Sequence, residues 1–401
     1  MPNTPIPKNE FERIIDLSEY DLDYAGLEDN FKDLAKLAAN VAGTKISLVN
    51  LIDSFTQWSI SNHGLALDQM PREDSVCQYT IMNHQPFEVA DLSADDRFKD
   101  KFYVTDDPNL RYYYGLPLTT SDGHNVGALC VLDKEIKSIS PEKTELLKIV
   151  ANEIVNRLKA LKVINDLKGQ LKYADETKKK VAHDIRGPLG GIIGLAQIIS
   201  EQGHTNKIEE VLEFINLIQK SGRSILELAD EILTAEEKQA PKRDDFNLIL
   251  LKDKLEKLYQ PQARNKNITF TVFISPETAT VPFSRNKLLQ IIGNLISNSM
   301  KFTPEGGQVR VSLNLKAEKE TPVLLQMKVS DSGVGMSEQA IEKIVGGTAS
   351  STDGTDGEQG YGFGLALVKH LISSLNGTMN IISKPGEGAT FEVSLPQLSL
   401  N

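Results

Sequence analysis

A stretch of helical apolar spacing from Pro141 to Lys238 constrains this chain of 401 residues more than any other feature. At its start, apolar residues recur every seven positions in two runs: Leu147, Ile154 and Leu161, then Ile164 and Leu171. This spacing is a coiled-coil register with one shift. The chain therefore contains a long helix of coiled-coil type.

Two more helical runs follow, and the segment Gly203–Asn206 separates them. Apolar or small residues in the first run are spaced by four and three: Ile185, Leu189, Ile192, Ala196 and Ile199. The second run alternates in the same way: Ile208, Val211, Ile215, Ile218, Gly222, Ile225, Ala229 and Ile232. One antiparallel hairpin cannot enclose a core by itself, whereas two copies make a four-helix bundle. We therefore expect a homodimer.

Mixed α/β patterns flank this helical region. The first, from Asn30 to Lys134, predicts strands at 46–51, 56–60 and 125–132, with helices near 31–41 and from 141 onward. The second, from Phe246 to Pro396, predicts strands at 268–274, 308–315, 324–330, 379–383 and 390–395 and helices at 286–301 and 365–375. The expected fold class is multidomain α+β.

Composition excludes several classes of protein. The net charge of −11 argues against a general nucleic-acid binder, which needs a cationic surface. No run reaches the roughly 18 apolar residues of a membrane span, and residues 1–10 do not resemble a signal peptide. Cys77 and Cys130 form no CxxC pair, so neither a disulfide framework nor a zinc ribbon is expected. We expect a soluble, cytoplasmic protein.

His183 stands out among the six histidines, because Asp184 follows it on a strongly amphipathic helix. It falls outside the apolar face that begins at Ile185, so we expect it to be exposed. A carboxylate beside an imidazole fixes the tautomer and accepts the proton as the other nitrogen attacks. A lone pair of this kind is more often an ordinary surface histidine, so His183 needs support from elsewhere in the chain.

The C-terminal region gives that support. Asn294 and Asn298 are four residues apart and share a helix face, with Lys301 and Phe302 about one turn further on. Two amides on one face can offer oxygen ligands to Mg²⁺ that also holds nucleotide phosphates. Lys301 can meet the phosphates as a point charge.

Two glycine-rich motifs follow. Asp331–Gly335 comes directly after a predicted strand and places a carboxylate where it can accept a hydrogen bond from an exocyclic amine. Gly360–Leu365 opens a helix, so its backbone amides can approach a polyphosphate. A lone glycine cluster more often marks a flexible loop or another nucleotide fold. No single motif is specific, but their order is: the histidine helix, its partner helix, the paired asparagines, the aspartate-glycine turn, the glycine-rich lid and finally Gly388–Phe391.

In this order, residues from about 176 to 397 resemble the catalytic core of a two-component sensor histidine kinase. His183–Leu189 resembles the H box, Asn294–Thr303 the N box, and the glycine runs the glycine boxes. The resemblance implies an ATP-dependent protein histidine kinase with a Bergerat-type ATP-binding sandwich. It also implies that the γ-phosphoryl group passes to His183 and then to an aspartate of a separate response regulator.

The same resemblance implies roles for individual residues. Asn298 is expected to bind Mg²⁺, Asp331 to recognise adenine and Phe302 to lie against it, with Thr390 a weaker candidate for this pocket. The glycines expected at the nucleotide are Gly333, Gly335, Gly360, Gly362 and Gly364. Related ATPases carry a glutamate at the position of Asn294. An amide cannot act as that base, which favours transfer to histidine over hydrolysis.

The sequence departs from the family pattern at three places. Gly187 stands four residues after His183, where families with phosphatase activity carry Thr or Asn. No phenylalanine-rich box is recognisable before the glycine-rich lid, where Ile341, Ile344 and Val345 stand. No Lys or Arg lies between Lys343 and Lys369, although many relatives use a basic lid residue.

Residues 26–160 resemble a GAF sensor domain. Four segments carry the resemblance: Ser75–Cys77, Asp91–Phe98, Arg111–Leu118 and Gly127–Asp133. They say little about the ligand, so the signal stays unknown. We expect Cys77 to be a packed thiol of the core. A role as a bilin anchor or a redox sensor is the less favoured alternative.

The sequence thus predicts an N-terminal extension (1–25), a GAF domain (26–160), and a signalling coiled coil (141–175) that overlaps its end. A dimerisation and phosphotransfer domain (176–240) and an ATP-binding domain (244–398) follow. The chain ends just after its last strand, so the receiver aspartate is expected on another protein. Two alternatives stay open: a non-catalytic ligand-responsive scaffold that binds ATP weakly, and a serine kinase of the same ATPase fold.

Overall fold

The computed structural model describes residues 5–203, 207–234, 246–283, 287–316, 323–346, 354–355 and 362–397. They form two compact units, one made of residues 1–163 and 245–401 and the other of residues 164–244. The first unit contains an N-terminal and a C-terminal α/β domain, and the second is helical. No helix in the described part of the chain is long and apolar enough to cross a membrane.

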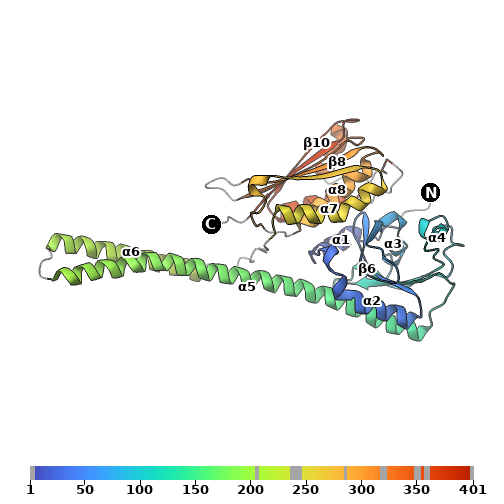
Figure 1. The fold of residues 1–401 in the computed structure, drawn as a ribbon, viewed down its shortest axis with the longest axis horizontal. Coiled ribbons are helices and arrows are strands. Elements are labelled where there is room, and N and C mark those ends of the chain that lie inside the picture. The colour runs from blue at the N-terminus through green and yellow to red at the C-terminus, as the bar shows by residue number, and fades with distance from the viewer. Residues whose placement is uncertain are drawn as a thin grey trace. The chain divides into compact units, whose positions relative to one another are not determined.

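The N-terminal domain is built on a six-stranded antiparallel sheet in the order β3-β2-β1-β6-β5-β4 (Figure 1). Its strands are β1 (Ile46–Ile52), β2 (Thr56–His63), β3 (Gln69–Pro71), β4 (Phe87–Val89), β5 (Tyr112–Thr119) and β6 (Asn125–Asp133). Its helices are α1 (Glu10–Ser18), η1 (Tyr24–Gly26), α2 (Glu28–Ala42), η2 (Arg72–Asp74), α3 (Cys77–Thr80) and α4 (Phe102–Thr105).

Both faces of this sheet are covered. Helix α2 and the first turns of α5 (Pro141–Gln202) share one apolar core with the sheet, and α3 and α4 contribute to a second core. Every residue of β1 and β6 is buried as a result. A strand buried on both faces is nearly continuous in apolar residues. This is why both strands were visible in the sequence, and their predicted positions are confirmed.

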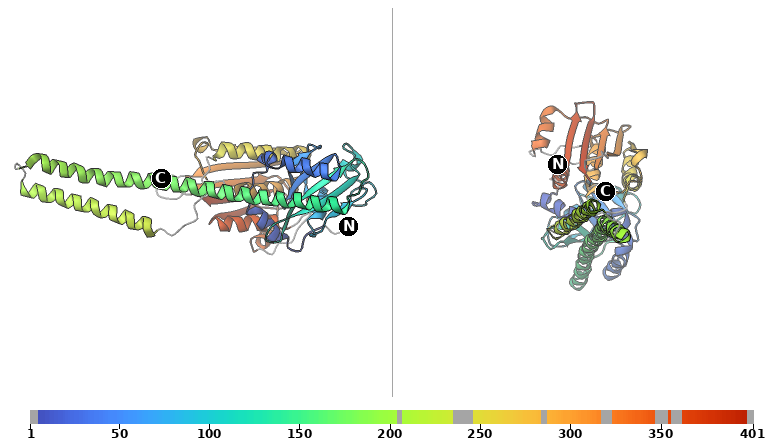
Figure 2. Two further views of the ribbon diagram at one scale, coloured as in Figure 1. Left: turned by 90° about the horizontal axis from the view of Figure 1, so that it is seen from below. Right: turned by 90° about the vertical axis from the view of Figure 1, so that its left-hand side faces the viewer.

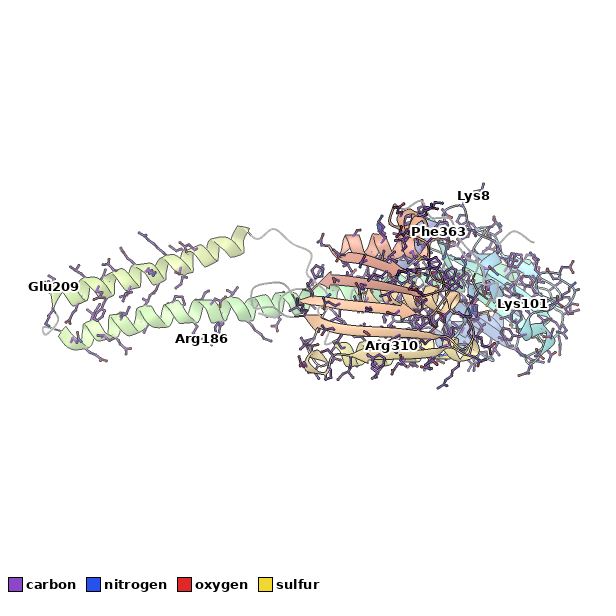
Figure 3. All side chains as sticks on the ribbon, turned by 90° about the horizontal axis from the view of Figure 1, so that it is seen from above. Lys8, Lys101, Arg186, Glu209, Arg310 and Phe363 are labelled. Atoms are coloured by element: carbon purple, nitrogen blue, oxygen red, sulfur yellow. The ribbon has the colours of Figure 1, made fainter. Side chains whose placement is uncertain are left out.

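The helical unit consists of the second part of α5 and helix α6 (Ile208–Thr234). Figures 1 and 2 both show α6 folding back alongside α5. None of the side chains described between residues 164 and 234 is buried, and large apolar ones are exposed, among them Leu171, Leu189, Ile193, Ile208, Leu212 and Leu226. Figure 3 shows side chains projecting from both helices, with Arg186 on α5 and Glu209 on α6.

The C-terminal domain is a two-layer sandwich of helices on a five-stranded sheet (Figure 1). Its strands are β7 (Thr269–Ile274), β8 (Gln308–Lys316), β9 (Leu324–Asp331), β10 (Thr378–Ser383) and β11 (Ala389–Pro396), in the order β10-β11-β9-β8-β7. Its helices are α7 (Leu248–Asn265), η4 (Pro276–Thr278), α8 (Leu288–Phe302), α9 (Glu338–Gly346) and α10 (Gly364–Ser374).

Only β7 and β8 pair in parallel in this sheet. Burial alternates along β8, β9 and β11, because one face packs against α7, α8 and α10. The five strands and two helices predicted here are confirmed to within two residues at each end. Helices α1, α7 and α9 were not predicted from the sequence.

Candidate functional site

A cavity of about 960 Å³ opens at the end of β9, beside α8 and the start of α10. Residues from the predicted nucleotide site line it: Asn298, Lys301, Phe302, Asp331, Gly335, Gly362 and Gly364. The structure thus gathers motifs that lie up to 66 residues apart in the sequence into one cavity.

The Asp331 carboxylate is held in place by three hydrogen bonds. Its Oδ1 accepts from the backbone amides of Gly333 and Ala389, each at 3.0 Å, and its Oδ2 accepts from the Ser299 hydroxyl at 2.9 Å. Burial raises the pKa of this carboxyl above its ordinary value, although the three hydrogen bonds act in the opposite direction. A fixed carboxylate at the floor of an apolar cavity suits recognition of an amine on a flat base.

Asn294 and Asn298 lie on the same face of α8, and both are nearly buried. Asn294 Nδ2 donates to the Gln290 carbonyl at 2.8 Å, whereas Asn294 Oδ1 is buried without a hydrogen-bond partner among the described residues. A buried carbonyl oxygen of this kind needs a partner. Amide oxygens one turn apart fit the oxygen ligands that Mg²⁺ takes at phosphates.

Gly335 is required by geometry. Its φ is +68°, and a Cβ on it would collide with the Lys384 carbonyl. Only glycine fits both conditions. The tight turn after Asp331 therefore depends on this residue.

Three cationic or ring-nitrogen groups border the cavity. Lys301 is nearly buried, and its ammonium lies 5.1 Å from the centre of the Phe302 ring. Lys369 and His370, from α10, also line the cavity. Lys369 and His370 were not predicted from the sequence, although their place one to two turns after the glycine motif could have indicated them. The glycine-rich lid has no Lys or Arg, but Lys301 and Lys369 still provide lysine side chains at the cavity.

Not every predicted nucleotide residue lines the cavity. Thr390 lies between Ala389 and Phe391, which do line it, and its hydroxyl donates to Ser330 at 3.0 Å instead. Successive strand residues point to opposite faces of a sheet, which explains the difference. Gly333 and Asn294 are not lining residues either, and Gly360 lies outside the described residues.

The phosphoacceptor candidate lies in the helical unit. His183 is on α5, and its side chain is 86% exposed. Its Nδ1 is 3.2 Å from Asp184 Oδ1. If Nδ1 carries the proton and donates it to Asp184, Nε2 is left with a free lone pair in solvent. The expected exposure and pairing of His183 are both present.

The two cysteines, 53 residues apart in the sequence, meet inside the N-terminal domain. Both thiols are free and buried, and their sulfur atoms are 3.8 Å apart. Burial acts to raise the pKa of the Cys77 thiol, but hydrogen bonds with Cys130, Tyr113 and Asn50 outweigh it and lower that pKa to about 7. Cys77, the first residue of α3, is a packed thiol of the core.

Two family models match the regions that carry these motifs. Residues 179–241 match the His Kinase A (phospho-acceptor) domain. Residues 284–399 match the histidine kinase-, DNA gyrase B- and HSP90-like ATPase. The two matched segments are therefore similar to the phospho-acceptor domain and the ATPase domain of histidine kinases, and sensor histidine kinases are among the relatives of the chain.

Curated relatives share part of the chain. A cyclic di-GMP phosphodiesterase of Pseudomonas aeruginosa is 34% identical over 166 residues, 41% of this chain and 28% of that protein. The autoinducer 2 sensor kinase/phosphatase LuxQ of Vibrio vulnificus is 33% identical over 224 residues, 54% of this chain and 26% of LuxQ. The sensor histidine kinase AruS of P. aeruginosa is 30% identical over 246 residues, 58% of this chain and 24% of AruS.

The chain thus spans about a quarter of the length of these relatives. Among solved structures, it is similar to the catalytic domain of histidine kinase ThkA, with 23% identity and a TM-score of 0.33. That similarity covers 39% of this chain and 95% of the ThkA chain.

Proposed function

We propose that this chain acts in the cytoplasm as a sensor histidine kinase. It binds ATP, phosphorylates its own His183 and passes the phosphoryl group to an aspartate of a separate response regulator, under the control of a GAF-type N-terminal domain. The observation that carries the proposal is the cavity that gathers Asn298, Asp331 and Gly364 from α8, β9 and α10.

The chemistry follows from the His183–Asp184 pair. Nε2 of His183 attacks the γ-phosphorus of ATP, the bond from that phosphorus to the bridging oxygen breaks, and ADP leaves with the electron pair. The proton on Nδ1 passes to Asp184 at 3.2 Å, so the phosphohistidine stays neutral at the ring. In the second step a carboxylate of the regulator attacks the same phosphorus and the N–P bond breaks. Its electron pair stays on Nε2, and Asp184 returns the proton to Nδ1, so that neutral His183 is restored.

At the cavity, the side chains bind and orient the nucleotide. Asp331 accepts from the adenine amine, Phe302 packs against the base, and Lys301 attracts the phosphates. Asn298, with Asn294 one turn before it, would hold Mg²⁺, which when bound neutralises phosphate charge. Asn294 offers no basic group to activate water, so little hydrolysis competes with transfer to His183.

The proposed kinase is a homodimer. The apolar side chains exposed on α5 and α6 need a cover, and a second hairpin of the same kind supplies it in a four-helix bundle. The heptad spacing at the start of α5 would extend this contact as a coiled coil.

Incubation of the full chain with γ-labelled ATP and Mg²⁺ tests the proposal. We expect label that is lost in acid, because phosphohistidine is acid-labile, and none in His183→Gln. Acid-stable label would instead indicate a serine kinase of the same fold. Absence of label, with nucleotide still bound, would indicate a non-catalytic scaffold.

A further inference from the structure

Two aromatic side chains of the N-terminal domain line the nucleotide cavity. Phe11 comes from α1, and Phe55 comes from the turn between β1 and β2. Both domains belong to one compact unit of the chain. Phe11 packs edge-on against His370, with 6.3 Å between ring centres. Phe55 lies so close to Gly364 that a Cβ on this glycine would collide with its ring.

The position of Phe55 matters because α10 begins at Gly364. The first turn of a helix has free backbone amides, and these bind phosphate groups. A phenyl ring at this point offers no polar atom and occupies space next to those amides. A polyphosphate chain and the Phe55 ring therefore compete for the same end of the cavity.

We propose that the N-terminal domain inhibits the kinase by placing Phe55, with Phe11 beside it, in the nucleotide cavity. Docking of this domain and binding of ATP then exclude each other, and a signal activates the kinase by withdrawing the β1–β2 turn. The inference rests on the proposed function, because it assigns a means of regulation to the same ATP site.

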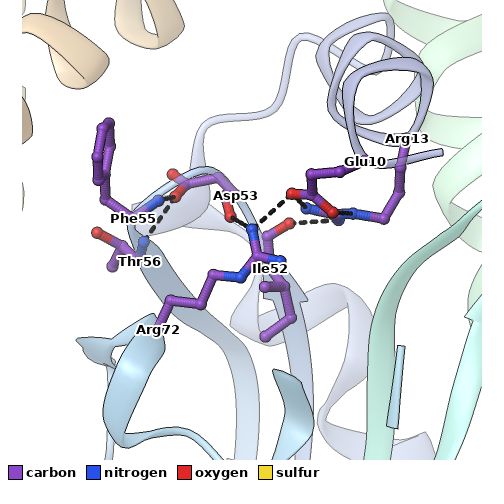
Figure 4. Close-up of polar contacts among 7 residues, drawn as sticks. All are labelled: Glu10, Arg13, Ile52, Asp53, Phe55, Thr56 and Arg72. Carbon is purple, nitrogen blue, oxygen red and sulfur yellow. Dashed lines mark hydrogen bonds and ion pairs between the residues drawn. The ribbon is translucent and has the colours of Figure 1, made fainter. Parts of the chain in front are cut away.

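The turn that carries Phe55 is held rigidly by polar contacts (Figure 4). Asp53 Oδ1 accepts from the backbone amides of Phe55 and Thr56, at 2.9 and 2.7 Å. Arg72 donates to the Asp53 carbonyl at 3.1 Å and to Glu10 at 2.5 Å. Phe55 is therefore presented at a fixed place rather than carried on a loose loop.

Helix α1 is part of the same network. Arg13 donates to the Ile52 carbonyl at 2.6 Å and to both oxygens of Glu10, at 2.8 Å each. Glu10, Arg13 and Arg72 are all fully or almost fully buried. This cluster, which we call the Glu10 cluster, ties α1 to the β1–β2 turn, so Phe11 and Phe55 move together.

The contact between the two domains has a polar border. Lys287, at the start of α8, pairs with Glu19 at 2.6 Å, and Lys254 of α7 pairs with Asp23. All four side chains keep some exposure to solvent, between 15 and 43%. Partly exposed ion pairs each contribute little to stability, and contacts between domains are often transient. Such a border lets the domains separate and redock.

The apolar part of the contact leads towards the N box. Trp58 of β2 stacks on Tyr24 at 5.0 Å and meets Tyr259 of α7 edge-on at 6.0 Å. The Tyr259 hydroxyl in turn occupies the space beside Gly293, the residue before Asn294. Trp58 also donates to Asp53 Oδ2 at 2.6 Å, so the same strand supports the Phe55 turn and contacts the ATP-binding domain.

The test measures binding of a non-hydrolysable ATP analogue with Mg²⁺ to the full chain by calorimetry. Phe55→Ala should bind it more tightly than the parent, and should label His183 faster with ATP. If about a tenth of the parent molecules are undocked, the gain approaches tenfold. Phe102→Ala, which truncates an exposed phenylalanine of the same domain, is the matched control and should behave as the parent. Equal or weaker binding by Phe55→Ala overturns the proposal.

A second variant tests docking without touching the cavity. Asp23→Lys sets two cations against each other at the border and should also tighten nucleotide binding, and Lys254→Asp added to it should restore the parental affinity. Hydrogen exchange gives an independent readout: the analogue should speed amide exchange in residues 10–18 and 53–56. Protection of these segments by the analogue would show that the N-terminal domain helps to hold nucleotide, and would overturn the inference.

The same measurements distinguish failure of the proposed inhibition from failure of the proposed kinase function. If parent and variants all bind the analogue and label His183 equally, inhibition is refuted and the kinase assignment stands. If none of them binds the analogue, the proposed function fails, and the regulation built on it fails with it.

Discussion

The Ser299 hydroxyl donates a hydrogen bond of 2.9 Å to Asp331 Oδ2 and so ties helix α8 to the end of β9. The other oxygen, Oδ1, already accepts from the amides of Gly333 and Ala389. A carboxylate oxygen can accept more than one hydrogen bond. Oδ2 therefore keeps capacity for a further N–H donor, and we assign this oxygen to the adenine amine.

Asp331→Asn should weaken ATP binding and relax discrimination against GTP, because guanine carries a carbonyl where adenine carries an amine. Loss of a hydrogen bond to a charged group costs about 1.5 to 3 kcal/mol, or roughly 10- to 150-fold in affinity. Calorimetry with ATP and GTP analogues measures both effects. Ser299→Ala, which keeps the carboxylate, should lose much less. Equal ATP affinity in Asp331→Asn and the parent would contradict the role of Asp331.

Nucleotide affinity should also depend on pH through Asp331. The carboxyl accepts from adenine only when ionised, and burial raises its pKa above the ordinary value. The affinity for nucleotide is therefore highest at pH values above that raised pKa, and it falls as the pH drops through this pKa. Isotherms between about pH 4 and 7 should show the decline, beyond the titration of the nucleotide itself. In Asp331→Asn only the nucleotide's own titration should remain, and the same curve for both proteins would count against the idea.

His183→Gln should abolish autophosphorylation and leave ATP affinity unchanged, because His183 lies in the helical unit and the ATP cavity does not. Asp184→Asn should bind nucleotide normally but react more slowly, since it loses the proton acceptor. General-base contributions are on the order of 10²–10⁴ in rate. Quenched-flow labelling measures the rates. Acid-labile label on His183→Gln would show that another histidine is the acceptor.

The Glu10 cluster should make the stability of the N-terminal domain depend on pH. Burial acts to raise the pKa of the Glu10 carboxyl, but the charges and hydrogen bonds of Arg13 and Arg72 outweigh it and lower that pKa from 4.5 to about 2. A carboxyl whose pKa is lower in the folded state than in the unfolded state stabilises the folded domain. This stabilisation is complete at pH values above the pKa of the unfolded state. We expect this stabilisation above about pH 4.5 and its loss as the pH falls towards 2.

Glu10→Gln should remove this dependence and destabilise the domain at neutral pH. Two buried guanidinium groups then lose their shared carboxylate, and breaking a buried ion pair costs about 3 to 5 kcal/mol. Urea unfolding of the parent and the variant at pH 7 and near pH 3 measures the difference. Glu12→Gln, on the same helix, is the control. A constant difference at both pH values would argue against the cluster as the titrating element.

The strands and the cavity were predictable from the sequence to different degrees. Strands such as β1 and β6 were visible because they are buried on both faces, and the order of the motifs predicted that Asn298 and Asp331 meet. Phe55 was not predictable, since its contact with Gly364 spans more than 300 residues and depends on how two domains dock. The orientation of Thr390 was not predictable either, because the motif alone does not say which face of β11 a residue occupies.

Gly187 stands four residues after His183 on α5. It is exposed, and a Cβ built on it meets nothing within 4 Å. A larger residue therefore fits here without displacing a neighbour. Pro188, inside the same helix, removes one helical hydrogen bond, and glycine is itself a poor helix former. The helix nevertheless continues to Gln202.

We predict that the proposed kinase dephosphorylates its response regulator poorly. In related kinases the side chain at this position is thought to orient the water that attacks the aspartyl phosphate, and Gly187 has no group that can hold a water. Purified phosphorylated regulator, with kinase and ADP, should lose label no faster than without kinase. Gly187→Thr and Gly187→Asn should accelerate the loss, because the site is sterically open, whereas Gly191→Thr, at an equally open glycine one turn on, should not. Rapid dephosphorylation by the parent would refute the prediction, since another group would then have to position the water.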